Sequence, residues 1–395
     1  MVKRWLVLVI WSLLDYSNCI LIFYRIDTEC WIIVSVIFIW SLVTMMILPG
    51  KIHYGPPTRS NYRPKYCNSG WMFYLLSLSI TVPLIWHYSV LHLYYKFSTF
   101  IGVLILWAVT LSMALFVKGH IAPDEGEHNS SGNPIFDYFC GIELYPHLLP
   151  SVNIKILFNS RFFHLLWNLI VLTAWKANYE LRGQFNWQMS IVTILPTAYI
   201  AKSCFWEDGY MHSFDITSER LGFILTYGVF VHVPVFYTLP STFLVVNSLP
   251  NEQLNVPIQV TSLVLFSVSL LATYKIDTQR IHSRLNDGQC TVWRRSPKLI
   301  KAKYRDEYGN EQSSLLLASG YWGFSRHPNY LSESVIFLAM ALPTESILPH
   351  VLLLIIITTL VHRTFRDDNK CALKYQKYWN DYRQLVPYKI VPGIF

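Results

Sequence analysis

Residues 351–375 read VLLLIIITTLVHRTFRDDNKCALKY, an apolar run that turns polar without a break. In the polar half, Arg363, Asp367, Cys371 and Tyr375 recur at every fourth position, so on a helix they form one continuous stripe. Ionisable groups on a membrane helix cost free energy and are functional candidates for that reason. The alternative interpretation is a basic helix that only anchors the last span at the lipid headgroups.

Apolar runs recur along the whole chain of 395 residues. Hydrophobic residues make up 53% and charged residues 14%, whereas charged residues are about 25% of a typical soluble domain. We therefore expect an all-α polytopic integral membrane protein with about ten transmembrane helices, several of them near the ~20 residues that cross a bilayer. The expected helices cover residues 5–24, 31–49, 71–92, 99–117, 158–176, 186–205, 219–247, 256–275, 330–344 and 346–361.

The run at 5–24 predicts a membrane helix and not a cleavable signal peptide, because it is long and lacks a small-residue cleavage site. Basic residues cluster after the second, eighth and tenth expected helices. The positive-inside rule therefore predicts that both termini and these basic segments are cytosolic. The net charge of +8 comes from these segments, so it does not indicate a nucleic-acid partner. The seven cysteines have no ligand-type spacing, and we expect neither a metal site nor a disulfide framework.

Pro343 and Pro349 predict a tight hairpin between the last two spans. The hairpin brings residues 326–330 (RHPNY) to the same side as the stripe of 363–375, next to the basic segment that starts at Arg280. Arginines and aromatic rings are what a dinucleotide phosphate requires, as forks for phosphates and a face for a flat ring. A strand followed by GxGxxG is absent from the sequence, which excludes a Rossmann domain as the source. We therefore expect the C-terminal helices to form a cytosol-facing cofactor pocket.

The segments LVHRTFRDDNKCALKY (360–375) and VPYKIVPGIF (386–395) resemble the C-terminal motif of the sterol reductase family. That family includes the Δ14- and Δ7-sterol reductases, the Δ24(28)-reductase and the membrane domain of the lamin B receptor. The resemblance extends over nearly the whole chain from Leu48. Gln376 departs from it, because the family usually carries Gly there. The motif residues are His362, Arg363, Arg366, Asp367, Cys371, Lys374 and Tyr375.

The resemblance implies NADPH as cofactor and reduction of a sterol carbon–carbon double bond. The cofactor positions that it implies are Arg280, Arg284, Leu317, Trp322, Asn329, Tyr330, Asp367, Cys371, Ala372, Leu373, Lys374, Tyr375 and Tyr382. Such a double bond has no carbonyl group to polarise it and must be protonated before hydride adds, so the reaction needs a proton donor. The resemblance points to Tyr375, Asp367 and Tyr237 as the catalytic group. We expect a tyrosine hydroxyl to be the donor and Asp367 to orient and recharge it.

A second motif, GNPIFDYFCGIELYPHL (132–148), also resembles the family, with His147 where Arg is usual. Asp137 and Glu143 within it are expected to line the sterol side or to tie the two halves together, and a solvated loop is the alternative. The segments GIELYP, FWEDGY, DGQCTVW and SGYWG are closer to the Δ7 branch than to the Δ14 branch. The implied substrate is a 5,7-diene sterol, reached from the membrane lipid.

The expected division is residues 1–120 as N-terminal membrane helices and residues 121–395 as the catalytic region with the NADPH pocket, within one membrane unit. The expected location is the endoplasmic reticulum membrane if the source is eukaryotic. Three alternatives stay open. They are a Δ14-sterol reductase, an enzyme like isoprenylcysteine carboxyl methyltransferase, which shares an ArgHisProxTyr segment, and a non-catalytic sterol-binding relative.

Overall fold

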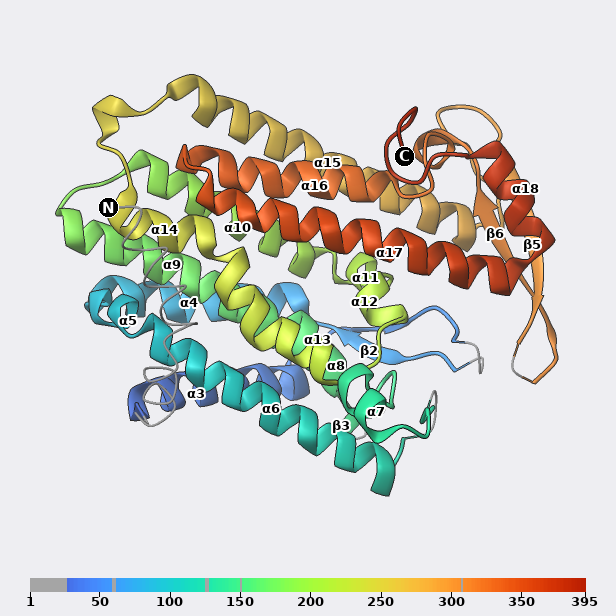
Figure 1. Ribbon diagram of the computed structural model, residues 1–395, viewed down its shortest axis with the longest axis horizontal. Coiled ribbons are helices and arrows are strands. Elements are labelled where there is room, and N and C mark those ends of the chain that lie inside the picture. Colours follow the sequence, from blue (N-terminus) through green and yellow to red (C-terminus); the bar gives the residue numbers. More distant parts are fainter. Residues whose placement is uncertain (1–26, 59–61, 125–127, 150, 307) are drawn as a thin grey trace. The chain divides into compact units, whose positions relative to one another are not determined.

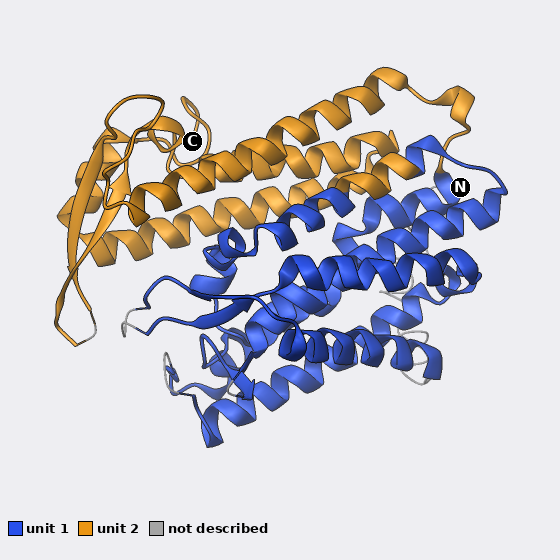
Figure 2. Cartoon of the chain, turned by 180° about the vertical axis from the view of Figure 1, so that it is seen from behind, with its two compact units in different colours: residues 1–58, 62–189, 196–247 blue, residues 59–61, 190–195, 248–395 orange. Residues whose placement is uncertain are grey.

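The computed structural model describes residues 27–58, 62–124, 128–149, 151–306 and 308–395, and it forms two compact units (Figures 1 and 2). Unit 1 holds the described residues up to 247 apart from 190–195, and unit 2 holds 190–195 and 248–395. Helices dominate both units, which confirms the predicted helical membrane class. The functional division at residue 120 stays a prediction, because compactness does not locate catalytic residues.

Unit 1 contains most of the first helices and two short hairpins. Its elements are α3 (Thr28–Ile47), β1 (Lys51–Tyr54), β2 (Lys65–Asn68), α4 (Gly70–His87), α5 (Leu91–Tyr95), α6 (Phe97–Ile121), α7 (Pro134–Cys140), β3 (His147–Leu149), β4 (Val152–Asn153), α8 (Ile154–Ile156), the π-helix η1 (Leu157–Phe162), α9 (Phe163–Arg182), most of α10 (Trp187–Phe205), α11 (Glu207–Met211), α12 (Phe214–Thr217), α13 (Phe223–Tyr227), the π-helix η2 (Gly228–Tyr237) and α14 (Leu239–Asn247).

The core of unit 1 is aromatic and is built around the two π-helices. Phe162 of η1 stacks on Phe230 of η2, with ring centroids 4.4 Å apart. Pro234 lies inside η2, and its missing N–H removes one bond of an α-helical ladder, which favours a locally altered helix. Beside this core, the buried Arg161 side chain donates to the buried Glu207 carboxylate. A buried charge needs such a partner, because an unpaired one would be strongly destabilising.

Unit 2 is a set of long helices capped at one end by a hairpin. Its elements are η3 (Asn251–Gln253), α15 (Val256–Leu285), β5 (Leu299–Arg305), β6 (Glu311–Leu317), η4 (Gly320–Gly323), α16 (Pro328–Ala341), η5 (Leu342–Thr344), η6 (Leu348–His350), α17 (Val351–Tyr375) and α18 (Lys377–Leu385). Helix α16 packs against both α15 and α17, and the three run side by side in Figure 1. The hairpin, α18 and the C-terminal segment gather where α15 and α17 end.

The predicted helices within the described residues all correspond to helices, although their ends differ. Seven candidate spans are long and apolar enough to cross a membrane among the described residues: Thr28–Ile47, Gly70–His87, Phe97–Ile121, Ile154–Arg182, Phe223–Asn247, Val256–Leu285 and Leu348–Tyr375. Helices α10 and α16 fall outside this set, and the predicted helix at 5–24 lies outside the described residues. The number ten therefore stays a prediction.

One feature of the fold differs from the expectation. The prediction of an exclusively helical chain omitted three two-stranded antiparallel sheets, β1–β2, β3–β4 and β5–β6. The apolar part of the last span was predicted to end at residue 361, and α17 continues through the predicted polar stripe to Tyr375 without a break. The hairpin before it is as predicted, because Pro343 and Pro349 lie in the short 3₁₀ turns η5 and η6 that separate α16 from α17.

Candidate functional site

The cofactor residues predicted from the sequence, which all belong to unit 2, gather at the capped end of its helices. Arg280 and Arg284 are in the last turns of α15, and Trp322 is in η4. Asn329 and Tyr330 are in the first turn of α16, and the stripe occupies the end of α17. Because α15, α16 and α17 pack together, predicted positions that are far apart in the sequence, from Arg280 to Tyr382, lie near one end of these helices.

The guanidinium group of Arg280 lies over an aromatic ring. Its guanidinium carbon is 4.3 Å from the centre of the Trp322 ring, a cation–π contact. The ring is fixed because Trp322 donates its indole N–H to the carbonyl of Ile276 at 2.8 Å. Arg280 also contacts Asp277, with Nη2 and Oδ1 3.5 Å apart, and Asn329 donates to the same Oδ1 at 3.3 Å. This part of the site therefore combines a charge, an aromatic face and an amide.

Arg284 is exposed, and its Nε donates to the backbone carbonyl of Leu315 in β6 at 3.3 Å. The end of the same strand is held by Tyr382, whose hydroxyl donates to the carbonyl of Leu317 at 3.1 Å. Burial raises the pKa of the Tyr382 phenol, while the positive charges of Arg280 and Arg284 act in the opposite direction. Tyr382 therefore stays protonated and keeps its hydrogen bond to the strand.

Tyr375 ends α17 inside a run of aromatic rings. Its side chain is 7% exposed and packs edge-on against Tyr304 of β5, with ring centroids 5.7 Å apart. Trp379 and Tyr382 of α18 continue the run at centroid separations of 6.5 and 5.1 Å. The ammonium of Lys374 lies 4.1 Å from the centre of the Tyr304 ring. The hairpin thus covers the end of the stripe with aromatic surface.

Asp367 lies between a thiol and an imidazole. Its Oδ2 is 3.9 Å from the Cys371 sulfur and 3.8 Å from Nε2 of His327. The ring of His327 in turn stacks on Tyr330, with centroids 4.8 Å apart and planes 11° apart. The stripe predicted from the spacing of four is therefore helical, and it faces the residues of the RHPNY segment. His327 did not belong to the predicted site.

Not every predicted position lies in this cluster. Ala372 packs against the buried hairpin cluster, whereas the side chain of Leu373 is 75% exposed. Tyr237 belongs to unit 1, at the C-terminal end of η2, where the rings of Phe163 and Trp167 meet it edge-on at 6.2 and 5.1 Å. Its assignment to the catalytic group stays a prediction.

The neighbouring carboxylate, Asp368, was missed by the sequence analysis. It is 8% exposed, and it accepts hydrogen bonds from Arg326 at 2.8 Å, from the Trp379 indole at 3.1 Å and from Arg383. These contacts tie α17 to α18 and to the segment that precedes α16. The sequence offered one signal for this network: a second aspartate beside Asp367, and arginines at positions 326 and 383 that could pair with it. Spacing alone does not reveal which arginine contacts which aspartate.

Gln376, the departure from the family pattern, has φ 48° and ψ −116° between α17 and α18. Glycine adopts a positive φ without steric cost, whereas a residue with a Cβ is strained there by about 1–3 kcal/mol. The glycine of the family is thus explained by backbone conformation at this helix end. The departure affects the conformational energy of the turn and removes no polar group from the site.

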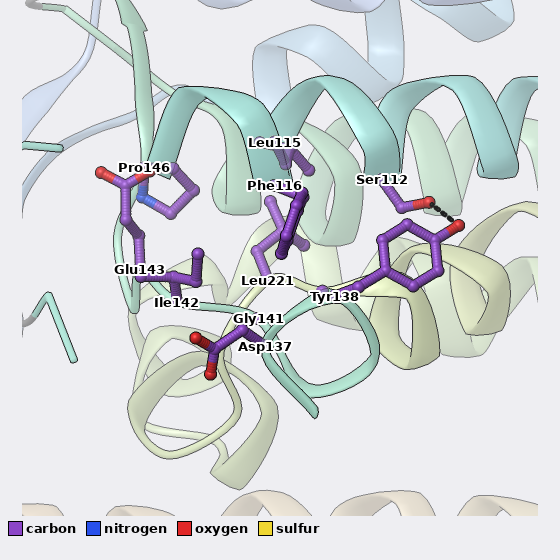
Figure 3. A pocket seen from close by; sticks show the side chains of 11 residues that line it. Ser112, Leu115, Phe116, Asp137, Tyr138, Gly141, Ile142, Glu143, Pro146 and Leu221 are labelled. Atoms are coloured by element: carbon purple, nitrogen blue, oxygen red, sulfur yellow. Dashed lines mark hydrogen bonds between the residues drawn. The ribbon is translucent and has the colours of Figure 1, made fainter. Parts of the chain in front are cut away.

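The second predicted motif surrounds a small pocket in unit 1 (Figure 3). Asp137 accepts from the hydroxyl of Ser130 at 2.5 Å and from the amide of Ser131 at 2.9 Å. Glu143 accepts from Lys118 at 3.0 Å and from the amide of Asp124 at 2.7 Å. Both carboxylates are buried and hold loop segments to helices of unit 1, so neither belongs to a solvated loop. Whether they also face sterol stays a prediction.

His147 lies beside the same network. Its backbone N–H donates to Asp124 at 2.6 Å, and its Nδ1 is 3.5 Å from the same oxygen. Asp124 also pairs with Lys118 at 2.8 Å. The imidazole therefore contacts an acid that already has a cationic partner, which explains how a histidine is accommodated at a position where the family usually has arginine.

The unit 2 residues fit a dinucleotide phosphate in their chemistry. Two arginines supply forks for phosphate oxygens, and the side-chain oxygen of Asn329 is buried and accepts no hydrogen bond from a described residue. Such a buried acceptor favours a ligand donor nearby. Among the described residues, no group of three or more His, Cys, Asp or Glu side chains is arranged to hold a metal ion.

Comparisons with known proteins show the family to which the chain belongs. The chain is 33% identical to the 7-dehydrocholesterol reductase of Arabidopsis thaliana over 92% of its own length and 85% of that protein. It is 30% identical to the 7-dehydrocholesterol reductase of Xenopus laevis, over 88% and 74% of the two chains. A Δ14-sterol reductase of Methylotuvimicrobium alcaliphilum is 31% identical over 67% and 60%. The ergosterol biosynthesis ERG4/ERG24 family matches residues 4–395, and the chain therefore belongs to this family of sterol reductases.

Proposed function

We propose that this protein reduces the Δ7 double bond of a 5,7-diene sterol, with NADPH as the hydride donor. The observation that carries the proposal is the cluster in unit 2 where Arg280 stacks on Trp322 beside the unpaired oxygen of Asn329. Two 7-dehydrocholesterol reductases among the relatives favour Δ7 as the position reduced.

The roles follow from the chemistry of each group. Arg280 and Arg284 hold phosphates, and Trp322 offers a face for a ring. When bound, NADPH supplies the hydride. The alkene carbon that receives no hydride takes a proton, and Tyr375 is the proposed donor because its hydroxyl is the exchangeable group at the end of the stripe. Asp367 lies two helical turns before Tyr375 on α17, about 12 Å along the helix axis, so its proposed role is to recharge that tyrosine through intervening groups. Tyr237 is the alternative donor.

The direct test is reduction of a 5,7-diene sterol by the purified protein in detergent with NADPH. The conjugated diene absorbs in the ultraviolet, so its loss is followed over time. Time-dependent loss with NADPH, and none without it, is the expected result. An intact diene together with reduction of a Δ14 sterol would move the protein to the second candidate, a Δ14-sterol reductase, which the Methylotuvimicrobium relative favours. If the folded protein reduces neither sterol, the remaining candidate is a non-catalytic sterol-binding relative of these reductases.

The paired arginines give a prediction about the cofactor. Replacing Arg280 or Arg284 with Ala should raise the KM for NADPH by roughly 10- to 150-fold, since a charge-assisted hydrogen bond contributes about 1.5–3 kcal/mol. The KM for sterol should change far less. Initial rates of diene loss at varied NADPH measure this effect.

Arg305→Ala is the matched control for these variants, because Arg305 is an exposed arginine of β5 outside the cluster. It should leave the KM for NADPH within about twofold, as expected for an exposed surface charge. Equal NADPH affinity in the folded wild type and in both cluster variants would refute the assignment of the phosphates to Arg280 and Arg284.

We also propose that both termini face the cytosol, and that the membrane is the endoplasmic reticulum in a eukaryotic source. The basic segments after α15 and α17 support this orientation. It places Asn129, within the acceptor sequence Asn129–Ser130–Ser131, on the cytosolic side, where glycosylation does not occur. Expressed in eukaryotic cells, the protein should show no glycosidase-sensitive mass shift. A shift that disappears in Asn129→Gln would reverse the orientation.

A further inference from the structure

His327 is a buried histidine that contacts Tyr330 and Asp367, two of the predicted cofactor positions. It was assigned neither to the catalytic group nor to the cofactor positions. It is 8% exposed and is the N-cap residue of α16. Its backbone N–H donates to the carbonyl of Lys389 at 2.8 Å, and its own carbonyl accepts from the amide of Tyr330 at 3.1 Å. The backbone N–H of the preceding residue, Arg326, donates to the carbonyl of Tyr388 at 2.9 Å. The backbone that carries the imidazole is therefore held on both sides.

The ring itself is held between Tyr330 and Asp367. One face stacks on the Tyr330 ring at 4.8 Å, and Nε2 points to Asp367, with 3.8 Å between Nε2 and Oδ2. That separation exceeds an N–H···O hydrogen bond, which is about 2.7–3.2 Å. Catalytic and binding contacts are commonly longer in a ligand-free protein and shorten when the ligand is bound. A small rotation of the carboxylate would complete the bond.

The surroundings of the imidazole favour its neutral form. Burial lowers the pKa of His327 to about 4, although the nearby carboxylates of Asp367 and Asp368 act in the opposite direction. Arg280 and Arg326 also face the ring, and their positive charges lower the pKa further. A neutral imidazole carries one N–H, and in the Nε2–H tautomer that hydrogen faces Asp367. The ring then offers one donor without adding a further charge to a site that already contains several arginines.

We propose that His327 is a positioning residue of the cofactor site, which donates its Nε2–H to Asp367 and supports the ring of Tyr330. The inference rests on the proposed function, because it takes NADPH as the cofactor and Asp367 and Tyr330 as two of the cofactor positions that the family resemblance implies. Its role is to hold the carboxylate in one orientation when the cofactor binds. A histidine that only fills space would contribute to folding and not to the affinity for NADPH.

The test is equilibrium binding of NADPH to the purified full-length protein. His327→Phe keeps a ring for stacking on Tyr330 but removes the N–H. We expect NADPH affinity to fall by roughly 10-fold or more, the effect of one hydrogen bond to a charged group, while the thermal midpoint without NADPH changes little. His327→Gln, which restores an N–H donor, should recover part of the loss. His282→Phe replaces an exposed histidine of α15 and is the matched control.

A double-mutant cycle separates positioning from packing. In the Asp367→Asn background, His327→Phe should cause a much smaller further loss of NADPH affinity than it causes alone, because the partner is already altered. Additive losses, or unchanged affinity in His327→Phe, would overturn the inference. If His327→Phe does not fold, the same cycle with His327→Leu, which also lacks a side-chain N–H, decides it by the same criterion. Failure of the wild type to bind NADPH would instead overturn the proposed function, so the two failures are distinguishable.

Discussion

Replacing Tyr375 with Phe is expected to slow the reduction of a 5,7-diene sterol by roughly 100-fold or more, the usual contribution of a positioned acid. The substitution removes the only exchangeable side-chain proton at that position. It keeps the ring, which is buried against Tyr304 and Trp379. The aromatic packing at the end of α17 should therefore survive, and the loss should be in kcat.

The measurement is ultraviolet loss of the diene at saturating NADPH and sterol, together with the binding affinity for NADPH. The affinity should stay within a few-fold of the wild type, because the phenol is not one of the phosphate ligands. Asp367→Asn should slow turnover and weaken NADPH binding together, since Asp367 has both proposed roles. Near-normal turnover in Tyr375→Phe would exclude Tyr375 as the donor and leave Tyr237 as the next candidate.

Replacing Asp368 with Ala is expected to destabilise the protein by about 3–5 kcal/mol, because it leaves buried positive charge without its partner. Arg326 and Arg383 both donate to this carboxylate, and Arg326 is itself buried. The Trp379 indole loses its acceptor at the same time. The connections of α17 to α18 and to the segment before α16 should loosen as a result.

Thermal unfolding in detergent, followed with and without NADPH, measures this effect. Asp381→Ala is the matched control, because Asp381 is an exposed aspartate on α18, and surface substitutions usually change stability by less than about 0.5 kcal/mol. A stable Asp368→Ala protein with reduced NADPH binding would show that Asp368 acts in the site directly. A stable variant with unchanged binding would show that the buried network is dispensable.

The stripe of α17 illustrates what local sequence determines. Positions four apart share a helix face whatever surrounds the helix. Once a helix was expected, the sequence alone therefore placed Arg363, Asp367, Cys371 and Tyr375 on one face. The apolar runs determined the membrane class in the same way, because a bilayer imposes a length and a composition on any helix that crosses it. The proline pair likewise determined the break between α16 and α17.

The different environments of Asp367 and Asp368 illustrate what tertiary structure alone decided. Adjacent residues of a helix point about 100° apart, so the two carboxylates face different neighbours. The spacing of four placed Asp367 on the stripe, but the sequence contains nothing that identifies the partners of Asp368. The packing of α18 places Arg383 and Trp379 on Asp368, while the start of α16 places His327 beside Asp367. The β5–β6 hairpin that covers Tyr375 was also missed, because strand pairing joins segments through contacts that no single window of residues contains. Helical periodicity is a local property of the chain, whereas the partner of each buried charge depends on which distant segments pack around it.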